Sequence, residues 1–356
     1  TTETTNGGGE AGGSTLNIQS LALGELRLFT DTPPSPDELC RRARARPSRA
    51  SEPGAIMEAR KLAEAEAAMA AGAKLLKTSM FGRWKPDYEM AATEYEKAAV
   101  AFRVAKAMPQ AIGAFMKCAE AHEQSNSKFM AAKHLETAAL LAKDNLKLYE
   151  QTCQLYEKSS KLHEEDNRVD AAADALIKAA RAIESENTER GSKLVEVACD
   201  LYENAIELTE VQVLQSLDTY KAAVQYLNRA KQYARAASLL SRQASVHARV
   251  DQPHNVARCE LSSIILLLKA NKFVAAEDGC NAAQARGDGF GGNDEAFAAV
   301  ELLDAYARQS AEAIAACVAQ PVFTYLDNHV TLIARGAIFC LLMSLLGPAP
   351  LLPLRV

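Results

Sequence analysis

The chain has 356 residues, of which 48% are hydrophobic and 24% are charged, and its formal net charge is -5 at pH 7. This composition is ordinary for a globular protein of about one to three domains, and the mild negative charge gives no electrostatic basis for nucleic-acid binding. The cysteines are scattered without a C-x-x-C pair, which favours reduced thiols over disulfides; they are Cys40, Cys118, Cys153, Cys199, Cys259, Cys280, Cys317 and Cys340.

Residues 1–56 are predicted to be a disordered, low-complexity extension. They begin with TTETTNGGGEAGGST and contain the basic run CRRARARPSRASEPG, and neither stretch can bury enough apolar surface to offset its chain entropy. We expect a solvated tail here, with a targeting or lipid-binding segment as the alternative, and we expect no secretory signal. Because patterned sequence begins near Met57, this methionine is the expected biological start.

From residue 57 to about 320 the apolar residues follow helical spacing, and the alternation typical of strands is nearly absent. The first interruption is the loop SMFGRWKPD at 79–87, which holds the only tryptophan, Trp84. Pro86 disfavours helical backbone in the residue before it. We therefore expect Trp84 and Lys85 to lie in a loop.

A sequence pattern recurs five times between residues 88 and 283. Each copy begins with a large anchor residue, followed after one or two residues by an Ala-Ala pair, which lets a neighbouring helix approach closely. The first three anchors and the last two follow one another at about 40 residues. The copies are YEMAATEYEKAAVAF from Tyr88, FMAAKHLETAALLA from Phe129, VDAAADALIKAARAI from Val169, YARAASLLSRQASV from Tyr233 and FVAAEDGCNAA from Phe273.

Partner helices and turn signals lie between these copies. The partner helices are predicted at 109–123, 146–162 and 191–208, and the turns at 125–127, 164–168 and 251–253. A single helical hairpin cannot bury its apolar face, so consecutive hairpins must stack. The predicted fold class is all-α: a tetratricopeptide-like right-handed array of antiparallel helical hairpins over 57–285, with about ten or more helices and a period above the standard ~34 residues.

Catalytic and metal-binding motifs are not recognisable in the sequence. The six histidines have neither H-E-x-x-H nor zinc spacing, and we expect surface or core-edge roles for them. GDGFGG at 287–292 lacks the preceding strand and the G-K-[ST] of a phosphate loop, which favours a flexible connection between helices. We expect no enzyme activity, no cofactor and no metal.

Three stretches carry a family resemblance. LLKTSMFGRWKPDYEMAATEYEKAAVAF resembles the start of gamma-type soluble NSF attachment proteins (SNAPs), where a long first helix leads through an aromatic loop into the first repeat. KANKFVAAEDGC and QPVFTYLDN resemble later helices of that family and its C-terminal helical bundle, which we expect at 286–335. The resemblance runs from about residue 57 to residue 330.

The resemblance implies a function in vesicle fusion and intracellular transport, including transport between endoplasmic reticulum and Golgi. SNAPs are adaptors that lie along the four-helix bundle of syntaxin-type and other SNAREs. They recruit the hexameric ATPase NSF, which pulls the bundle apart, and they hydrolyse nothing themselves. The implied location is the cytoplasm, with weak peripheral attachment to vesicle, Golgi or vacuolar membranes.

The loop at 79–87 is the predicted membrane-attachment site. Burial of one large apolar side chain contributes about 1.5–3 kcal/mol, and a basic residue beside an anionic leaflet adds about 1 kcal/mol. Together these values suit a reversible contact, well short of an anchor. The alternative for Trp84 is a capping position in the core of the first hairpin. The predicted residues are Met80, Phe81, Trp84, Lys77, Arg83 and Lys85.

The resemblance also indicates candidate contacts with SNAREs and NSF. Basic residues of SNAPs face an acidic SNARE bundle, and the matching candidates are Arg168, Lys178 and Lys221, although Asp174 stands where a lysine is expected. Lysine and arginine on helix surfaces are usually just solvated, which is the competing interpretation. For NSF, the candidates are Glu301 and Asp304 in VELLDAYARQS, where Ala307 and Arg308 replace expected acidic residues.

Residues 336–356 form an atypical apolar tail. This tail has no charged residue before Arg355, and Gly347, Pro348, Pro350 and Pro353 interrupt its second half. A membrane anchor and an altered terminus from another splice form or gene model are both open. For the whole chain, the alternative function is a generic tetratricopeptide-like scaffold of trafficking or chaperone type that binds peptides, and an enzyme is the more distant third.

Overall fold

The computed structural model describes residues 53–77, 85–205 and 207–345, with the side chains of 337–345 left out of the description. All regular elements in these residues are helical, which confirms the predicted all-α class. The predicted sites Met80, Phe81, Arg83 and Trp84 lie outside the described residues, as does most of the 1–56 extension. The domain boundaries after residues 56, 285 and 335 stay predictions.

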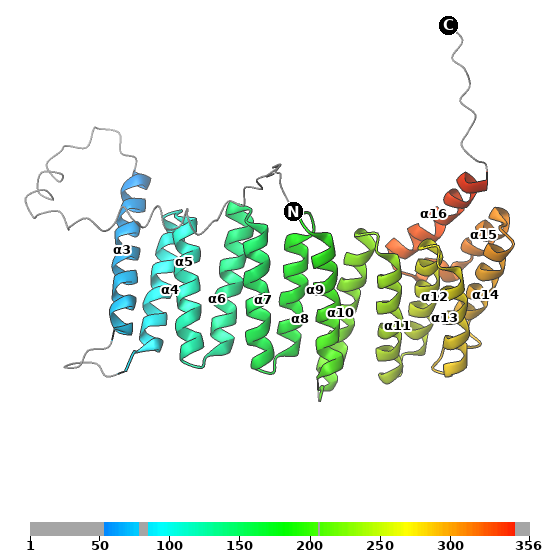
Figure 1. Ribbon diagram of the computed structural model, residues 1–356, viewed down its shortest axis with the longest axis horizontal. Helices are drawn as coiled ribbons and strands as arrows, with labels where there is room; N and C mark the ends of the chain where they lie inside the picture. The colour runs from blue at the N-terminus through cyan, green and yellow to red at the C-terminus, as the bar shows by residue number, and fades with distance from the viewer. Residues whose placement is uncertain (1–52, 78–84, 206, 346–356) are drawn as a thin grey trace, which may run out of the picture. The chain divides into compact units, whose positions relative to one another are not determined.

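The described helices pack mainly in chain order, each against the next (Figure 1). The first stretch contains α3 (Pro53–Leu76), α4 (Tyr88–Val104), α5 (Met108–Gln124), α6 (Lys128–Leu141), α7 (Tyr149–Glu165), α8 (Val169–Ile183) and α9 (Thr188–Asn204). The second contains α10 (Glu210–Arg229), α11 (Tyr233–Arg249), α12 (Pro253–Lys269), α13 (Phe273–Arg286), α14 (Asp294–Ala307), α15 (Ala311–Val318) and α16 (Asn328–Leu345). Short helical turns, η2 (Ala142–Leu146) and η3 (Pro321–Tyr325), complete the set.

The predicted anchors mark helix starts. Tyr88, Val169, Tyr233 and Phe273 open α4, α8, α11 and α13, and Phe129 is the second residue of α6. The first four Ala-Ala pairs are buried, as the close helix approach requires. The fifth pair differs, because Ala276 is buried whereas Ala275 is exposed.

One turn design connects most of the hairpins. A three-residue connection places its middle residue in the left-handed region, as Asn126 does at φ 63° and Asn167 at φ 55°. The residue after it donates a backbone hydrogen bond back across the end of the preceding helix, for example from Ser127 N to His122 O at 2.8 Å. This pattern is that of the Schellman motif, and it explains why helix length and hairpin geometry repeat together.

Two predicted helix ranges were wrong at their ends. The helix expected at 146–162 begins only at Tyr149, because the π-helical turn η2 ends α6 and Lys147 adopts φ 53°. The helix expected at 191–208 is α9, which starts earlier with Asn187 as its N-cap and ends at Asn204. Thr209 then begins α10 with a capping box to Gln212, and this cap outweighs the apolar pattern that continues through 205–208.

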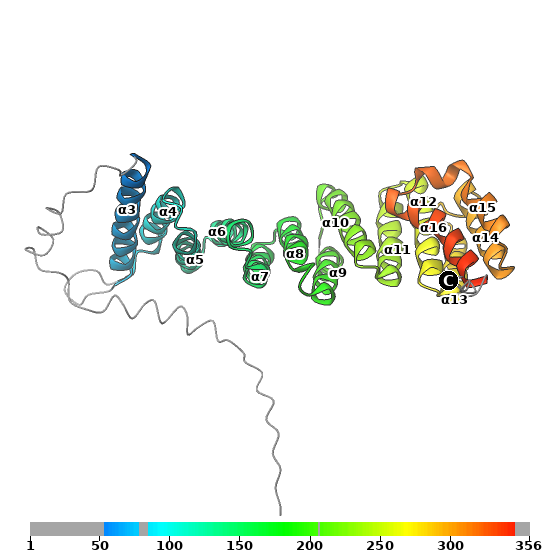
Figure 2. The same ribbon diagram turned by 90° about the horizontal axis from the view of Figure 1, so that it is seen from above.

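The C-terminal helices pack differently from the repeats. α12 contacts α14 and α16 as well as its neighbours α11 and α13, and Figure 2 shows α12–α16 gathered together. This confirms the C-terminal helical bundle of the predicted fold. The 287–292 stretch connects α13 to α14 as expected, but Phe290 within it is fully buried, so the connection is attached to the core. Within the described residues, no helix has both the length and the apolar character required to cross a bilayer.

Candidate functional site

The even-numbered helices α6, α8, α10 and α12 carry two adjoining grooves. The first groove, of about 570 Å³, is lined mainly by residues of α6, α8 and α10, and the second, of about 420 Å³, mainly by α10, α11, α12 and the segment 325–330. Asp218 of α10 lines both. We call this surface the grooved face. Figure 2 shows α4, α6 and α8 on one side of the row and α5, α7 and α9 on the other.

Arg168 lines the first groove from the start of α8, where it is the N-cap residue. Its guanidinium lies 4.3 Å from the centre of the Phe129 ring, and the Lys133 ammonium lies 4.7 Å from the same centre. Such stacking orients a cation without neutralising its charge. Arg168 and Lys133 therefore present two positive groups at one end of the groove.

Lys178 is held by carboxylates. Its ammonium lies 3.0 Å from Glu136 on α6 and 2.7 Å from Asp174 one turn earlier on α8. Burial opposes the charged form of Lys178, but its hydrogen bonds to Asp174 and Glu136 outweigh burial and raise its pKa. The positive charge of Lys178 is thus largely compensated within the protein, whereas no ion pair of Arg168 is found among the described residues.

Glu136 connects three elements of the grooved face. It accepts a hydrogen bond from Lys178 and lies 3.1 Å from Nε2 of the buried His163 on α7. Burial favours the protonated form, yet the hydrogen bonds from His163 and Lys178 prevail and lower the pKa of this carboxyl. Sequence reasoning missed Glu136. Its separation of 42 residues from Lys178, one repeat length, is the signal that would have found it.

Lys221 lies in the second groove, on α10. It is exposed, and no ion pair of this lysine is found within the described part of the chain. The other charged side chains and the histidine that line the same groove are Asp218, Asp327, Arg258 and His247. All three predicted SNARE-contact residues therefore lie on the grooved face, with Lys178 the most constrained of them.

The odd-numbered helices carry a different arrangement of charge. Arg190 of α9 reaches back to Glu150 and Glu157 of α7, at 2.6 and 2.9 Å. Arg235 of α11 repeats this contact one period later with Glu196 of α9, through two hydrogen bonds of 2.6 Å.

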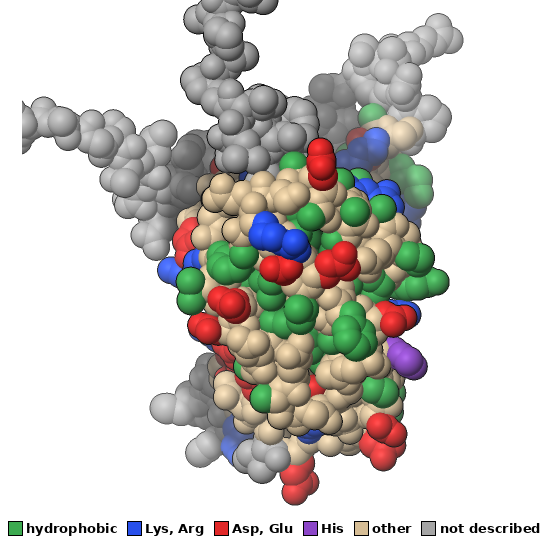
Figure 3. Space-filling model, turned by 90° about the vertical axis from the view of Figure 1, so that its right-hand side faces the viewer, with side chains coloured by type: hydrophobic (Ala, Val, Ile, Leu, Met, Phe, Trp, Pro, Cys, Tyr) green, Lys and Arg blue, Asp and Glu red, His purple; other side chains and the backbone are tan. Residues whose placement is uncertain are grey.

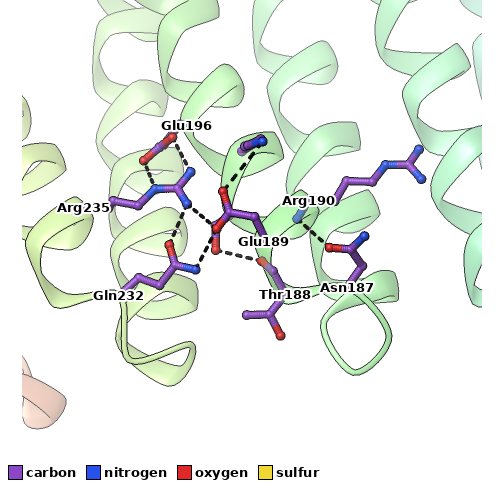
Figure 4. A network of polar contacts seen from close by, with 9 residues as sticks. Asn187, Thr188, Glu189, Arg190, Glu196, Gln232 and Arg235 are labelled. Atoms are coloured by element: carbon purple, nitrogen blue, oxygen red, sulfur yellow. Dashed lines mark hydrogen bonds and ion pairs between the residues drawn. The ribbon is translucent and has the colours of Figure 1, made fainter.

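Arg242 of α11 extends the series by bonding Asp200 and Glu203 of α9 at 2.6 Å each. We call the surface carrying Arg190, Arg235 and Arg242 the ladder face. Figure 4 shows the part around Glu189, to which Arg235 also donates at 3.0 Å. Each arginine bonds at least two carboxylates of the preceding odd-numbered helix, so the ladder links successive repeats.

The predicted NSF-contact residues lie on α14. Both Glu301 and Asp304 are exposed; Glu301 accepts a hydrogen bond from Gln320 at 2.6 Å, and Asp304 pairs with Arg308 one turn later. Figure 3 views this end of the molecule, where hydrophobic side chains are interspersed with acidic ones. The exposed large apolar residues of these C-terminal elements are Phe297, Val300, Tyr325 and Leu332.

The predicted membrane loop is described only at its ends. Lys77 follows α3 and Lys85 precedes α4, and both are exposed. The backbone N–H of Asp87 donates to the carbonyl of Leu75 at 3.2 Å, and the Asp87 side chain accepts from Met90 N at the start of α4. The segment between α3 and α4 is therefore closed at its base by a hydrogen bond.

Comparison with known proteins identifies the family. A model of the soluble NSF attachment protein family, SNAP, matches residues 59–333. The gamma-soluble NSF attachment protein of Dictyostelium discoideum is 31% identical over 280 residues, covering 79% of this chain and 84% of that protein. The protein of the same name from Arabidopsis thaliana is 29% identical over 253 residues, covering 71% and 84%. The chain therefore belongs to the soluble NSF attachment protein family, with gamma members among its relatives.

Proposed function

We propose that this protein is an adaptor that binds SNARE bundles along its grooved face and recruits the NSF ATPase for their disassembly in vesicle transport. The observation that carries the proposal is the family match over residues 59–333, which extends from α3 into α16. In this function the protein binds and positions its partners, and NSF supplies the ATP hydrolysis.

The charges of the grooved face support binding to an acidic helical bundle. Arg168 stacks on Phe129 beside Lys133, and Lys221 is exposed in the adjoining groove. Such charges increase the rate of encounter with a partner of opposite sign and favour one orientation of binding. Carboxylates also line the first groove, namely Glu136, Asp170, Asp174 and Asp218. Lys178 contributes less, because Glu136 and Asp174 already compensate it.

The test is a ternary pull-down of NSF and a SNARE bundle in ATP-γ-S, followed by release when ATP is hydrolysed. We expect Arg168→Glu with Lys221→Glu to weaken capture of the bundle by about tenfold or more, because each reversal replaces an attraction with a repulsion. The matched control is Lys161→Glu, an exposed lysine of α7 outside both grooves. Full capture by the double variant contradicts the proposed binding face.

The alternative function, a helical-repeat scaffold that binds peptides, would use the same two grooves. The release step separates the two functions, because only a disassembly adaptor couples the bound bundle to NSF. Capture of a peptide without NSF recruitment would favour the scaffold.

For recruitment of NSF we propose the exposed acidic residues of α14, Glu301 and Asp304. Asp304 is partly compensated by Arg308, so Glu301 is the stronger candidate. Glu301→Lys is expected to reduce NSF recruitment while SNARE capture persists. Glu277→Lys, on the exposed surface of α13, serves as the control. Equal NSF recruitment by both variants would remove Glu301 from the interface.

We also propose weak peripheral attachment to the cytoplasmic surface of vesicle, Golgi or vacuolar membranes through the loop between α3 and α4. The exposed Lys77 and Lys85 at the closed base of this loop support the proposal, because an anionic leaflet attracts them. Met80→Ser with Phe81→Ser is expected to reduce flotation with anionic liposomes. Val211→Ser with Leu214→Ser on α10 is the control pair, since both side chains are exposed. Equal flotation of the two double variants would contradict the attachment site.

A further inference from the structure

A cluster of three metal-binding side chains, one cysteine and two histidines, lies between α5 and α6. Cys118 and His122 are one helical turn apart on α5, and His134 lies on α6. One donor atom of each, the thiol sulfur and one ring nitrogen per histidine, lies within 4.8 Å of the other two. Cys118 and His134 are buried and His122 is half-buried.

The two imidazoles lack the hydrogen bonds that buried rings normally make. The rings stack almost parallel, with centroids 5.2 Å apart and planes 3° apart. Nδ1 of His122 and Nε2 of His134 are buried and have no hydrogen-bond partner among the described residues. An unpaired buried polar atom is costly, so it calls for a specific explanation.

Two other buried histidines each have one ring nitrogen beside a polar side chain, although Nδ1 of His163 is also buried without a partner among the described residues. Nε2 of His163 lies 3.1 Å from Glu136, and Nδ1 of His247 lies 2.9 Å from Gln252. Each of these rings has a polar partner from a neighbouring side chain. At His122 and His134 one ring nitrogen of each lies within 4.8 Å of the other and of the Cys118 sulfur.

Burial acts in opposite directions on the two kinds of ligand: it favours the neutral imidazoles that bind metal and disfavours the thiolate. Burial lowers the pKa of His122 and His134, so both rings are neutral with a free nitrogen lone pair near pH 7. Burial raises the pKa of the Cys118 thiol to about 12. The facing charged groups are Glu89 and Glu96 of α4 and Lys133 of α6, and the two carboxylates attract a cation.

We propose that Cys118, His122 and His134 bind one Zn²⁺ ion, with a water molecule as the fourth ligand. Two imidazoles, one thiolate and an oxygen form a tetrahedral donor set of the kind that Zn²⁺ prefers. Zinc–ligand bonds of about 2.0–2.3 Å place neighbouring donors about 3.3–3.8 Å apart, so binding draws the cluster together by about 1 Å.

Binding of the ion requires the Cys118 thiol to lose its proton, which passes to solvent, and the sulfur then donates its electron pair to Zn²⁺. The bound ion links α5 to α6 beside the turn 125–127. The site was not recognised in the sequence because its ligands come from two helices, in the order C-x3-H-x11-H, which matches none of the zinc spacings considered.

The test uses the full chain, purified without a polyhistidine tag. Co²⁺ is added as a spectroscopic substitute, and Zn²⁺ affinity is measured by competition with a chromophoric chelator. We expect one ion per chain and a thiolate-to-Co²⁺ absorption band in the near ultraviolet. Cys118→Ala should abolish the band and weaken Zn²⁺ binding by at least the ~10–100-fold that loss of an outer-shell partner costs.

Cys317→Ala is the matched control. Cys317 is also a buried helical cysteine, and its thiol donates to the Ala298 carbonyl at 3.5 Å, as Cys118 donates to the Ala92 carbonyl at 3.3 Å. We expect this variant to keep the band. A missing band in the unaltered chain, or a band that survives Cys118→Ala, would overturn the proposal.

A second variant tests the site at a half-buried residue, where a substitution disturbs folding less than it does at the buried Cys118. His122→Gln changes a half-buried ring, and circular dichroism checks its fold. Zn²⁺ should raise the unfolding temperature of the unaltered chain and of His247→Gln, because an ion that binds only the folded state stabilises it. It should not raise that of His122→Gln. An equal rise in all three proteins would show that the ion binds elsewhere.

Discussion

The grooved face and the ladder face are built from alternating helices of the same repeats, yet they use charge in opposite ways. On the ladder face, Arg190, Arg235 and Arg242 each bond at least two carboxylates of the preceding odd-numbered helix. On the grooved face, Arg168 stacks on a ring and Lys221 is exposed in a groove. The partner of each charge, rather than the number of charges, therefore distinguishes the ladder face from the proposed binding surface, where only Lys178 is paired with carboxylates in the manner of the ladder arginines.

The ladder face also joins helices that do not follow one another in the chain. Adjacent helices pack through small alanines, which contribute close contact but little buried area for each residue. The arginines join α7 to α9 and α9 to α11, and so they link repeats about 40 residues apart in sequence.

The largest expected effect comes from disturbing the place where the two faces meet. Gly191 of α9 lies against Tyr226 of α10, and a Cβ at residue 191 would lie 1.9 Å from the tyrosine hydroxyl oxygen. Gly191→Ala should therefore lower the free energy of unfolding by about 1–3 kcal/mol, since Tyr226 is fully buried and must shift. Urea denaturation measures this.

The control for that variant is Gly113→Ala on α5. A Cβ there meets no atom within 4 Å, so alanine should stabilise the helix by about 0.5–1 kcal/mol through its higher helix propensity. If the two substitutions have the same effect, the close contact between α9 and α10 does not exist in solution.

A smaller effect is expected from breaking the ladder itself. Arg235→Ala removes the bonds to Glu196 and Glu189 and should lower the free energy of unfolding by about 1 kcal/mol, as for a partly exposed pair. SNARE capture should be unchanged, because Arg235 lies outside both grooves. Chemical denaturation and pull-down on the same sample measure both. Lys193→Ala is the neutral control, because the exposed Lys193 ammonium lies 3.8 Å from Glu189, too far for a strong ion pair. A loss of capture in Arg235→Ala would erase the distinction between the faces.

Much of the fold could be predicted because its helix packing depends on a local residue pattern that repeats along the chain. The anchors Tyr88, Val169 and Tyr233 open helices as expected, since small and large residues recur at one period. The misplaced ends at 146–148 and 205–208 depended on caps and turns, where Lys147 and Thr209 outweigh apolar periodicity. Helix ends are determined by a few hydrogen bonds that periodicity does not contain.

The candidate sites were harder to predict for a different reason. Sequence reasoning placed Arg168, Lys178 and Lys221 among the binding candidates, and all three lie on the grooved face. It did not foresee that Glu136, 42 residues away, holds Lys178. It also missed the juxtaposition of Cys118 with His134, because pairing across helices depends on packing rather than on spacing within one helix.

A still smaller change, in the affinity for a SNARE bundle, is expected when Lys178 loses one of its two carboxylate partners. Asp174→Asn removes one of the two carboxylates that hold this lysine, so the net charge beside the first groove becomes more positive. Affinity for an acidic SNARE bundle should rise by about two- to fivefold at low salt, and the gain should shrink as salt screens it. Salt-dependent binding titrations measure this, with Asp278→Asn on the exposed surface of α13 as the control. An equal gain in the control would show that only the net charge of the chain matters.

The smallest effect is a change in the pH dependence of stability at Glu136. Its pKa is lowered in the folded chain: burial alone would raise it, but hydrogen bonds from His163 and Lys178 prevail. Between the lowered value and the ordinary value near ~4.3, the unfolded chain binds more protons than the folded chain. Stability contributed by this carboxylate is therefore complete above that window and is lost as the pH falls through the folded pKa.

Glu136→Gln keeps the shape of the side chain but cannot ionise, so it should lack this component of the acid loss. The unaltered chain should be more stable than the variant by about 0.5–1 kcal/mol at pH 7, and the difference should shrink at acid pH. Urea midpoints between pH 3 and pH 7 measure it, with Glu277→Gln as the control for losing one charge. A difference that stays constant with pH would mean that Glu136 stabilises the first groove through packing, and that Lys178 is less firmly held than its two carboxylates indicate.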